Sequence, residues 1–340
     1  MATLEMKAIC PPNQIFQILH GRWAAETLRA GVELDLFSKL ADGASDAKQL
    51  ASGVGADQHA MELLLNALVS LKFLVKTGDK FELNELSKVY LSKSSPLYMG
   101  GFVSDTHVAE AWKQLPEVVR TGKPVTTVNT NEKAEEFFPK LAAGIFPLNY
   151  STAHTVVTEL NLDQLPAGAC ALDLACGSGV WSIPLAQRNK QVQVDALDFP
   201  SVLNVTREFA EREGVEKQYS YLSGSWRQCK LESDKYDVIY LGHILHSEGR
   251  EESEALLKEC FRALRSGGRL IIAEMIGNDE FTGPPSAQLF ALNMLILTEK
   301  GCIFGESELK NILHSHGYKD ARRLKLPFWG EESPVMVASK

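Results

Sequence analysis

The chain has 340 residues, of which 45% are hydrophobic, and a formal net charge of −8 at pH 7. This length and composition predict a globular protein of roughly two domains, each able to bury a core. The negative charge argues against a nucleic acid as the main partner, because such binding rests largely on basic side chains that neutralise phosphates.

The sequence shows neither a membrane span nor a secretion signal. No apolar segment approaches the roughly 20 residues that a span needs, and the start M-A-T-L-E-M-K lacks the cationic and apolar regions of a signal peptide. The six cysteines form no C-x-x-C pair, so they predict neither a disulfide framework nor a zinc knuckle. They are Cys10, Cys170, Cys176, Cys229, Cys260 and Cys302. We expect a cytoplasmic protein with reduced thiols and no membrane partner.

The first part of the chain is predicted to be helical. Apolar residues recur at spacings suited to one or two amphipathic helices; they are Ile15, Ile18, Leu19, Leu28, Val32 and Leu36. A further helix is expected to begin at Ser45 or Asp46 as N-cap and to end at Gly53 and Gly55.

A longer helix is predicted to begin near Asp57, with one apolar face made of Met61, Leu64, Leu65, Leu68 and Leu71. It leads into a hairpin that turns at Gly78-Asp79. Helix, turn, helix and hairpin in this order are typical of a winged helix, so a transcription regulator is an alternative function. The would-be recognition helix carries Asp57, His59 and Glu62 against only Lys72, which leaves little positive charge for a phosphate backbone. A structural role for this part is therefore favoured.

The second part alternates strands and helices and begins with C-A-L-D-L-A-C-G-S-G-V, residues 170–180. The apolar run predicts a buried parallel strand with Asp173 near its carboxyl end, where open α/β sheets bind ligands. Gly177 and Gly179 allow positive φ and a close approach of the backbone to a ligand. An ordinary strand-to-helix turn is the alternative.

The next strand, V-Q-V-D-A-L-D-F-P at residues 192–200, ends at Asp198. An acid at this place in dinucleotide-binding sheets accepts hydrogen bonds from ribose hydroxyls. Ser182 stands where a third glycine of G-x-G-x-x-G is expected, and no G-K-[ST] follows. A nicotinamide site is therefore disfavoured and a P-loop is excluded.

The pair D-L-A-C-G-S-G and L-D-F-P resembles the binding signature of class I S-adenosylmethionine-dependent methyltransferases. The resemblance implies S-adenosyl-L-methionine as cofactor, with the glycine turn beside its methionine part and Asp198 on its ribose. The implied cofactor-binding residues are Asp173, Gly177, Gly179, Asp198, Phe199, Ser225 and Trp226. G-S-W, residues 224–226, departs from the family's G-D followed by an apolar residue, so the adenine contacts are expected to be reshaped.

The whole chain is similar to small-molecule O-methyltransferases of the plant caffeate and bacterial polyketide type. This resemblance implies an α/β fold: a Rossmann-like domain with a mostly parallel seven-stranded sheet over residues 166–340, preceded by a mainly helical winged-helix dimerisation domain over residues 1–100. Residues 101–165 are expected to be a helical linker that contributes to the acceptor pocket. A homodimer through the N-terminal domain is implied as well.

Further strands are predicted near Tyr219–Ser223, Tyr236–Leu241 and Arg269–Glu274. His243 and His246 then fall just beyond a carboxyl edge, on the same side of the sheet as the glycine turn. An imidazole with a pKa near 6.5 can take a proton from a hydroxyl at neutral pH. In the resembled enzymes a histidine at this place, in an H-D-W segment, is the general base, and His246 aligns with it although Ser247-Glu248 replaces Asp-Trp. A residue that caps or lines a helix start is the alternative.

R-S-G-G-R-L-I-I-A-E-M, residues 265–275, resembles the family's G-G-x-h-h-h-x-E strand and places Glu274 at its end. A carboxylate there could orient His246 and stabilise its protonated form; a solvated loop acid is the alternative. Many plant relatives carry a second acid where this chain has Ile303. Either Glu274 suffices or base catalysis is weaker than the resemblance implies.

Other side chains lie where relatives place the acceptor pocket, although plain core packing is the alternative for each. The predicted substrate-binding residues are Phe146, Asn149, Tyr150, His243, Met275, Phe290, Asn293 and Met294. His243 and His246 could also bind a metal together with Glu248 or Glu274, but no metal ligand is assigned.

The predicted function is methyl transfer from S-adenosylmethionine to a hydroxyl of a small, aromatic acceptor of secondary metabolism, with His246 as base. One alternative is C-methylation beside the ketone of an α-keto acid, where a histidine-bound metal could stabilise the enolate. Another is a non-catalytic scaffold, suggested by the departures at Ser225 and Ile303.

Overall fold

The computed structural model describes residues 12–128, 131–326 and 335–340, and the chain divides into two compact units, Met1–Asp105 and Thr106–Lys340. Cys10 and the start of the chain, on which two of the predictions rest, lie outside the described residues. None of the described helices combines the length and apolar composition required to cross a membrane.

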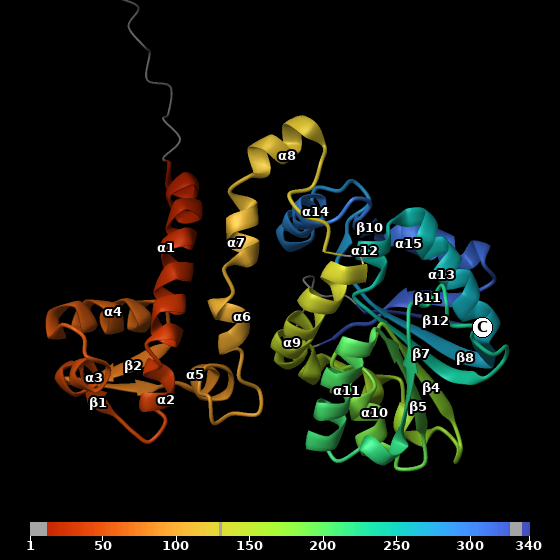
Figure 1. The fold of residues 1–340 in the computed structure, drawn as a ribbon, viewed down its shortest axis with the longest axis horizontal. Helices are drawn as coiled ribbons and strands as arrows, with labels where there is room; N and C mark the ends of the chain where they lie inside the picture. The colour runs from red at the N-terminus through yellow and green to blue at the C-terminus, as the bar shows by residue number, and fades with distance from the viewer. Residues whose placement is uncertain (1–11, 129–130, 327–334) are drawn as a thin grey trace, which may run out of the picture. The chain divides into compact units, whose positions relative to one another are not determined.

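The first unit is a set of helices around a small antiparallel sheet of order β1-β3-β2 (Figure 1). Its elements are α1 (Asn13–Glu33), α2 (Leu36–Lys39), β1 (Ser45–Asp46), α3 (Ala47–Val54), α4 (Gln58–Ser70), β2 (Leu74–Thr77), β3 (Lys80–Leu83), α5 (Glu85–Tyr90) and α6 (Gly100–Ser104). The predicted winged-helix order is confirmed.

Local signals explain where these helices begin. Asp46, and not Ser45, caps α3: its carboxylate accepts a hydrogen bond from the Gln49 backbone N–H at 2.8 Å, and the Gln49 side chain returns the contact in a capping box. Asp57 caps α4 by accepting from Ala60 N–H at 2.8 Å. The apolar face of α4 then packs Met61, Leu65 and Leu68 into the core of this unit.

The second unit contains a seven-stranded sheet of order β11-β12-β8-β7-β4-β5-β6. Its strands are β4 (Cys170–Leu174), β5 (Gln193–Asp198), β6 (Tyr219–Ser223), β7 (Tyr236–Gly242), β8 (Leu264–Ala273), β11 (Lys319–Arg323) and β12 (Val335–Ser339). The five from β4 to β8 run parallel, and β12 pairs antiparallel with both β8 and β11. The predicted mostly parallel α/β sheet is confirmed.

Helices cover both faces of this sheet. The helices of this unit are α7 (His107–Trp112), α8 (Leu115–Thr121), α9 (Asn131–Glu159), α10 (Ile183–Arg188), α11 (Pro200–Arg212), α12 (Leu245–Glu248), α13 (Arg250–Ala263), α14 (Pro285–Leu297) and α15 (Glu306–Ser315), of which α7 and α8 pack against α14. Two single turns, η1 (Leu162–Gln164) and η2 (Glu216–Gln218), and the short parallel pair β9 (Ile276–Gly277) and β10 (Phe304–Gly305) complete the unit. Figure 1 shows α9, α10 and α11 gathered on one side of the sheet and α13 and α15 on the other.

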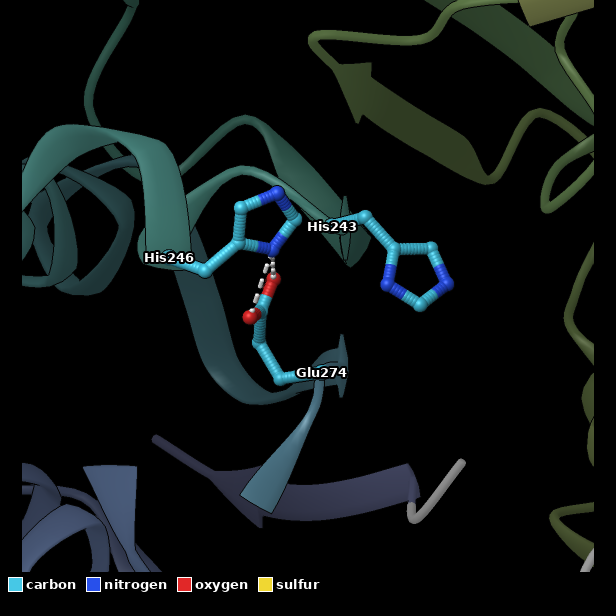
Figure 2. A group of neighbouring side chains, drawn as sticks. All are labelled: His243, His246 and Glu274. Carbon is cyan, nitrogen blue, oxygen red and sulfur yellow. Dashed lines mark hydrogen bonds and ion pairs between the residues drawn. The ribbon is translucent and has the colours of Figure 1, made fainter. Parts of the chain in front are cut away.

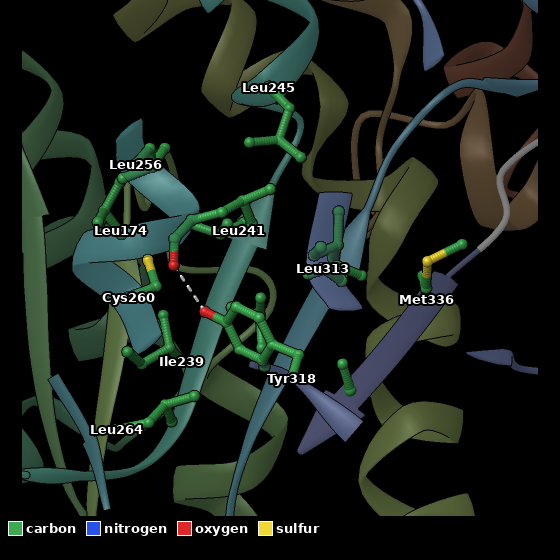
Figure 3. Close-up of a cluster of buried hydrophobic side chains, with 14 of the residues drawn as sticks. Leu174, Ile239, Leu241, Leu245, Leu256, Cys260, Leu264, Leu313, Tyr318 and Met336 are labelled. Atoms are coloured by element: carbon green, nitrogen blue, oxygen red, sulfur yellow. Dashed lines mark hydrogen bonds between the residues drawn. The ribbon is translucent and has the colours of Figure 1, made fainter. Parts of the chain in front are cut away.

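The main core lies between the sheet and the helices α13 and α15 (Figure 3). Fully buried leucines and isoleucines of β7 and β8 meet Leu256, Cys260 and Leu313 there, and the hydroxyl of Tyr318 donates to the Leu257 carbonyl at 2.9 Å. Residues 106–165, most of the segment 101–165 that was predicted as a helical linker, lie within the second unit, where α9 packs along α10 and α11. This core holds the carboxyl ends of β4, β5, β7 and β8 in one row.

Candidate active site

The turn after β4 has the backbone that its glycines suggested. Ala175, Gly177 and Gly179 have φ of +54°, +56° and +75°. A Cβ at Gly179 would come 3.2 Å from the Thr206 side chain, so both space and conformation favour glycine there. The result is a tight, largely buried turn at the carboxyl edge of the sheet, in which Ala175 and Gly177 are half-buried.

Asp173 lies beneath this turn and is fully buried. Its Oδ2 accepts a hydrogen bond from the Ser182 hydroxyl at 2.5 Å, and Ser182 in turn lies 2.8 Å from the Tyr219 hydroxyl. Oδ1 has no hydrogen-bond partner among the described residues. Burial raises the pKa of Asp173 to about 7. The Asp173 carboxyl therefore holds the turn through Ser182, and its Oδ1 accepts no hydrogen bond from the described residues.

Asp198 ends β5 and faces the same turn. Its carboxylate accepts hydrogen bonds from the backbone N–H of Gly177 at 2.9 Å and of Phe199 at 2.7 Å. Burial raises the pKa of Asp198 to about 6, and these two donors oppose the rise. Phe199 is the half-buried N-cap residue of α11. The predicted ribose acid and the glycine turn are thus in direct contact.

Ser225 and Trp226 follow β6 and lie next to Asp198, because Gly224 N–H donates to the Asp198 carbonyl at 2.9 Å. The indole N–H of Trp226 donates to Glu248 Oε2 at 3.3 Å, and the guanidinium of Arg227 lies 4.5 Å from the Trp226 ring. Ser225 Oγ accepts from Arg227 N–H at 3.4 Å. Ser225 and Trp226, which differ from the family pattern, therefore form a local network with Arg227 and Glu248.

His246, on the short helix α12, and Glu274, directly after β8, form an ion-pair geometry (Figure 2). Nδ1 of His246 lies 3.0 and 2.9 Å from the two carboxylate oxygens. Glu274 is fully buried, whereas the His246 side chain keeps 12% of its surface exposed. The edge of Phe290 packs on the His246 ring, with 4.8 Å between centroids. The predicted pair is brought together although 28 positions separate the two residues in the chain.

His243 lies beside this pair, with its ring centroid 6.1 Å from that of His246. It adopts φ of +64°, an uncommon conformation for a residue with a Cβ. Its Nε2 contacts Asn149 Oδ1 at 3.4 Å. Burial lowers the pKa of His243 to about 4, so this imidazole is neutral at physiological pH. Three atoms that could bind a metal lie within 4.8 Å of one another, one each from His243, His246 and Glu274.

The other predicted acceptor residues divide into two groups. Phe290 contacts His246, Met275 is half-buried next to Glu274, and Asn293 accepts from the Trp112 indole N–H at 2.9 Å. Met294, buried on α14, lies near Gly301, which approaches the His246 carbonyl.

Phe146 and Tyr150 instead pack between α9 and α11. Phe146 is fully buried, stacks on Tyr150 with centroids 5.0 Å apart, and lies 4.4 Å from the Phe209 ring, which Arg212 covers. Tyr150 OH contacts Gln187 and Glu213. In the structure, Phe146 therefore packs α9 against α11.

Two tryptophans at the site were not predicted. Trp181 is buried under the end of β7, where a Cβ at Gly242 would come within 2.2 Å of its ring, and it lies 6.0 Å from His243. Trp112 of α7 reaches Asn293 on α14. Trp181 could have been predicted as a site residue from its place just after the glycine turn. Nothing in the sequence indicates the contact of Trp112 with Asn293, because 181 positions separate the two residues.

The comparisons agree with this geometry. A family model described as the O-methyltransferase domain matches residues 112–319, and one described as the O-methyltransferase dimerisation domain matches residues 16–93. The chain belongs to the O-methyltransferase family. The predicted resemblance to S-adenosylmethionine-dependent O-methyltransferases is thereby confirmed, and the chain is an enzyme of that family.

Relatives match over nearly their whole length. A 3-hydroxy-5-methyl-1-naphthoate 3-O-methyltransferase of Streptomyces sahachiroi is 27% identical, with 95% of this chain and 94% of that protein covered. The acetylserotonin O-methyltransferase of Bos taurus is 28% identical, covering 89% and 91%. The solved structure of human N-acetylserotonin methyltransferase in complex with SAM has a TM-score of 0.82 at 23% identity, covering 100% and 99%, which supports the fold.

The buried acid Asp173 generates a prediction about stability. Its folded-state pKa of about 7 lies above the ordinary value of an aspartic acid, 3.8, so the native state binds more protons than the unfolded state and its stability falls as pH rises from 4 to 7. A shift of one pKa unit corresponds to about 1.4 kcal/mol. From pH 4 to pH 8, the free energy of unfolding of Asp173→Asn minus that of the wild type should therefore rise by about 4 kcal/mol. Urea unfolding at several pH values measures this. Asp42→Asn changes an exposed carboxylate and serves as the control. A difference between Asp173→Asn and the wild type that does not vary with pH would contradict the assignment.

Proposed function

We propose that the chain transfers a methyl group from S-adenosylmethionine to a hydroxyl of a small aromatic acceptor, with His246 as general base and Glu274 as the group that orients it. The observation that carries this proposal is the contact of His246 Nδ1 with both oxygens of the buried Glu274, at 2.9 and 3.0 Å. This contact lies on the carboxyl edge that also holds the glycine turn and Asp198.

The protonation of His246 follows from this contact. The carboxylate of Glu274 accepts a hydrogen bond, so Nδ1 carries the hydrogen and Nε2 keeps a free electron pair. Nε2 can then take the proton of an acceptor hydroxyl, and the buried carboxylate stabilises the resulting imidazolium. Phe290 restricts the ring from its edge. Bound S-adenosylmethionine supplies an activated methyl group, so the protein's main task is to place the hydroxyl oxygen in line with it.

The residues present fit such a cofactor. Asp198 offers a carboxylate to ribose hydroxyls, the Gly177–Gly179 turn offers close backbone approach, and Asp173 holds the turn through Ser182 while its Oδ1 keeps a free acceptor. Phe199, Ser225 and Trp226 lie along the same edge and are proposed to contact the adenosine. For the acceptor we propose the group near the imidazoles: Asn149, His243, Met275, Phe290, Asn293 and Met294.

The names of the relatives support an aromatic acceptor. They include a naphthoate O-methyltransferase, a tetracenomycin polyketide 8-O-methyltransferase and acetylserotonin O-methyltransferases. The half-buried apolar side chains of Met275 and Phe290 near His246 suit a flat ring.

A metal-assisted C-methylation is the second candidate, because His243, His246 and Glu274 each bring a ligand atom within 4.8 Å of the others. The direct contact between His246 and Glu274 favours the base, since a metal would need to separate these groups. Sensitivity of turnover to a chelator distinguishes the two candidates.

Replacing the base should abolish most turnover without affecting the cofactor. In His246→Ala, kcat on a panel of hydroxylated naphthoates and indoles should fall about 100- to 10,000-fold, the usual contribution of a general base. The Kd for S-adenosylhomocysteine, measured by calorimetry, should stay unchanged. His314→Ala, an exposed histidine on α15, is the control. Unchanged turnover in His246→Ala would remove the base, and loss of wild-type turnover with a chelator would favour the metal.

Cofactor affinity should depend on pH through Asp198. Ribose hydroxyls donate to the ionised carboxylate, and the pKa of Asp198 is raised to about 6 by burial. The affinity for S-adenosylhomocysteine should therefore be constant above pH 7 and fall by up to about tenfold per unit below pH 6. Asp198→Asn should bind weakly with no such slope between pH 5 and pH 8. Equal slopes in calorimetric titrations of both proteins would contradict the role of Asp198.

We further propose that the chain forms a homodimer through its N-terminal unit and binds no nucleic acid. The first half of α1 carries apolar side chains that are each more than half exposed: Ile15, Phe16, Ile18, Leu19 and Trp23. This stripe overlaps the region matched by the dimerisation domain. Such a contiguous apolar face is unusual on an isolated soluble unit and suits a self-complementary interface.

A charge in this stripe should break the dimer. Ile18→Asp would bury a carboxylate without a partner in the interface, so sedimentation should report a monomer at micromolar concentration. Val119→Asp changes an equally exposed apolar residue on α8, outside the matched dimerisation region, and should leave the dimer intact. A wild-type monomer, or a dimer in Ile18→Asp, would contradict the proposed interface.

A further inference from the structure

Two segments that follow different strands meet above the sheet edge. The sheet order places β4 and β5 between β7 and β6. Glu248 ends α12, which follows β7, and Trp226 lies in the loop after β6. Their contact therefore joins the segments that flank the glycine turn and Asp198.

The contact is specific in both hydrogen bonding and charge. Glu248 Oε2 accepts from the indole N–H of Trp226 at 3.3 Å and pairs with the guanidinium of Arg227. Arg227 lies over the Trp226 ring at 4.5 Å, a cation–π distance. Only 13% of the Glu248 side chain is exposed, so the charge is well shielded from water and depends on these partners.

Trp226 lies after β6, in the segment that Gly224 ties to the Asp198 carbonyl. It is half-buried, packs on the main core, and its one polar group is already used by Glu248. An indole that is held at its N–H and covered by a guanidinium keeps a defined orientation at low entropic cost. The resembled enzymes carry a tryptophan where this chain has Glu248; here the tryptophan comes from the other segment and is bound by that glutamate.

Glu248 also lies two residues from His246 on a helix of only four residues. Several contacts hold α12: Leu245 is buried in the main core, His246 pairs with Glu274, the His246 carbonyl accepts from Cys302 N–H at 2.8 Å, the Leu245 carbonyl accepts from the Ser253 hydroxyl at 3.0 Å, and Glu248 accepts from Trp226. A displacement of Trp226 therefore acts on the helix that carries the proposed base.

We propose that Glu248, Trp226 and Arg227 form a clamp that couples the adenine end of the cofactor site to α12. The proposal rests on the proposed adenosyl cofactor. Binding of the adenine against Trp226 tightens the contact with Glu248, and α12 is then held at both ends, by the clamp and by Glu274. The clamp residues are positioning residues for His246, and the cofactor prepares the site for the acceptor.

The test uses S-adenosylhomocysteine with the full-length protein and four variants. Glu248→Ala removes the clamp, Glu248→Gln keeps an acceptor for the indole but loses the charge, and Trp226→Phe identifies the emission of Trp226. Glu251→Ala removes an exposed carboxylate from the first turn of the neighbouring helix α13 and serves as the matched control. The measurements are calorimetric Kd, tryptophan fluorescence, and hydrogen exchange of the amides of residues 245–248.

In the wild type, the ligand should change the emission of Trp226 and slow exchange in α12. Glu248→Ala should raise Kd about tenfold, as expected for one charge-assisted hydrogen bond, and should lose both signals. The Kd of Glu248→Gln should lie between those of the wild type and Glu248→Ala. Glu251→Ala should match the wild type in Kd, emission and exchange. Wild-type values in Glu248→Ala and Glu248→Gln would overturn the clamp. Absence of binding by the wild type would overturn the cofactor assignment, and the clamp with it. Failure of the clamp alone is therefore recognised by wild-type binding that the Glu248 variants leave unchanged.

Discussion

The proposed chemistry depends on a carboxylate that water does not reach. Glu274 is fully buried and its two oxygens face Nδ1 of His246. A buried charge is costly unless a partner satisfies it, so this carboxylate fixes both the direction of the imidazole and the nitrogen that holds its hydrogen. The proposed base is therefore oriented by a buried carboxylate.

The parallel sheet makes this arrangement possible. The carboxyl ends of β4, β5, β7 and β8 form one row, so residues that follow four different strands share one edge. At the same edge, other contacts stand where this chain differs from the family pattern. Ile303, at the place of a second acid, is buried against Gly277, and Glu274 alone contacts Nδ1 of His246 among the described carboxylates. Trp226, Arg227 and Glu248 form a network where the family has other residues.

The site contains groups that oppose stability. Asp173 and Asp198 are acids whose pKa values are raised by burial, and His243 holds a positive φ while burial lowers the pKa of its ring. Such features are retained where a ligand or a reaction needs them, since selection for packing alone would remove them. Their concentration along one edge of the sheet agrees with the proposed cofactor and acceptor sites.

The sequence alone determined the order of the elements, the winged-helix pattern, and the strands that carry Asp173 and Asp198 near their carboxyl ends, because periodicity, glycine turns and short motifs are local properties of the chain. The pairing of His246 with Glu274 was expected only from the resemblance to the family. Tertiary structure decided which side chains meet. The 94 positions between Asn149 and His243, or the 22 between Trp226 and Glu248, carry no signal of proximity. Phe146 and Tyr150 were predicted beside the acceptor, but the rotation of α9 turns them toward α11, and only the packing of one helix on another sets that rotation.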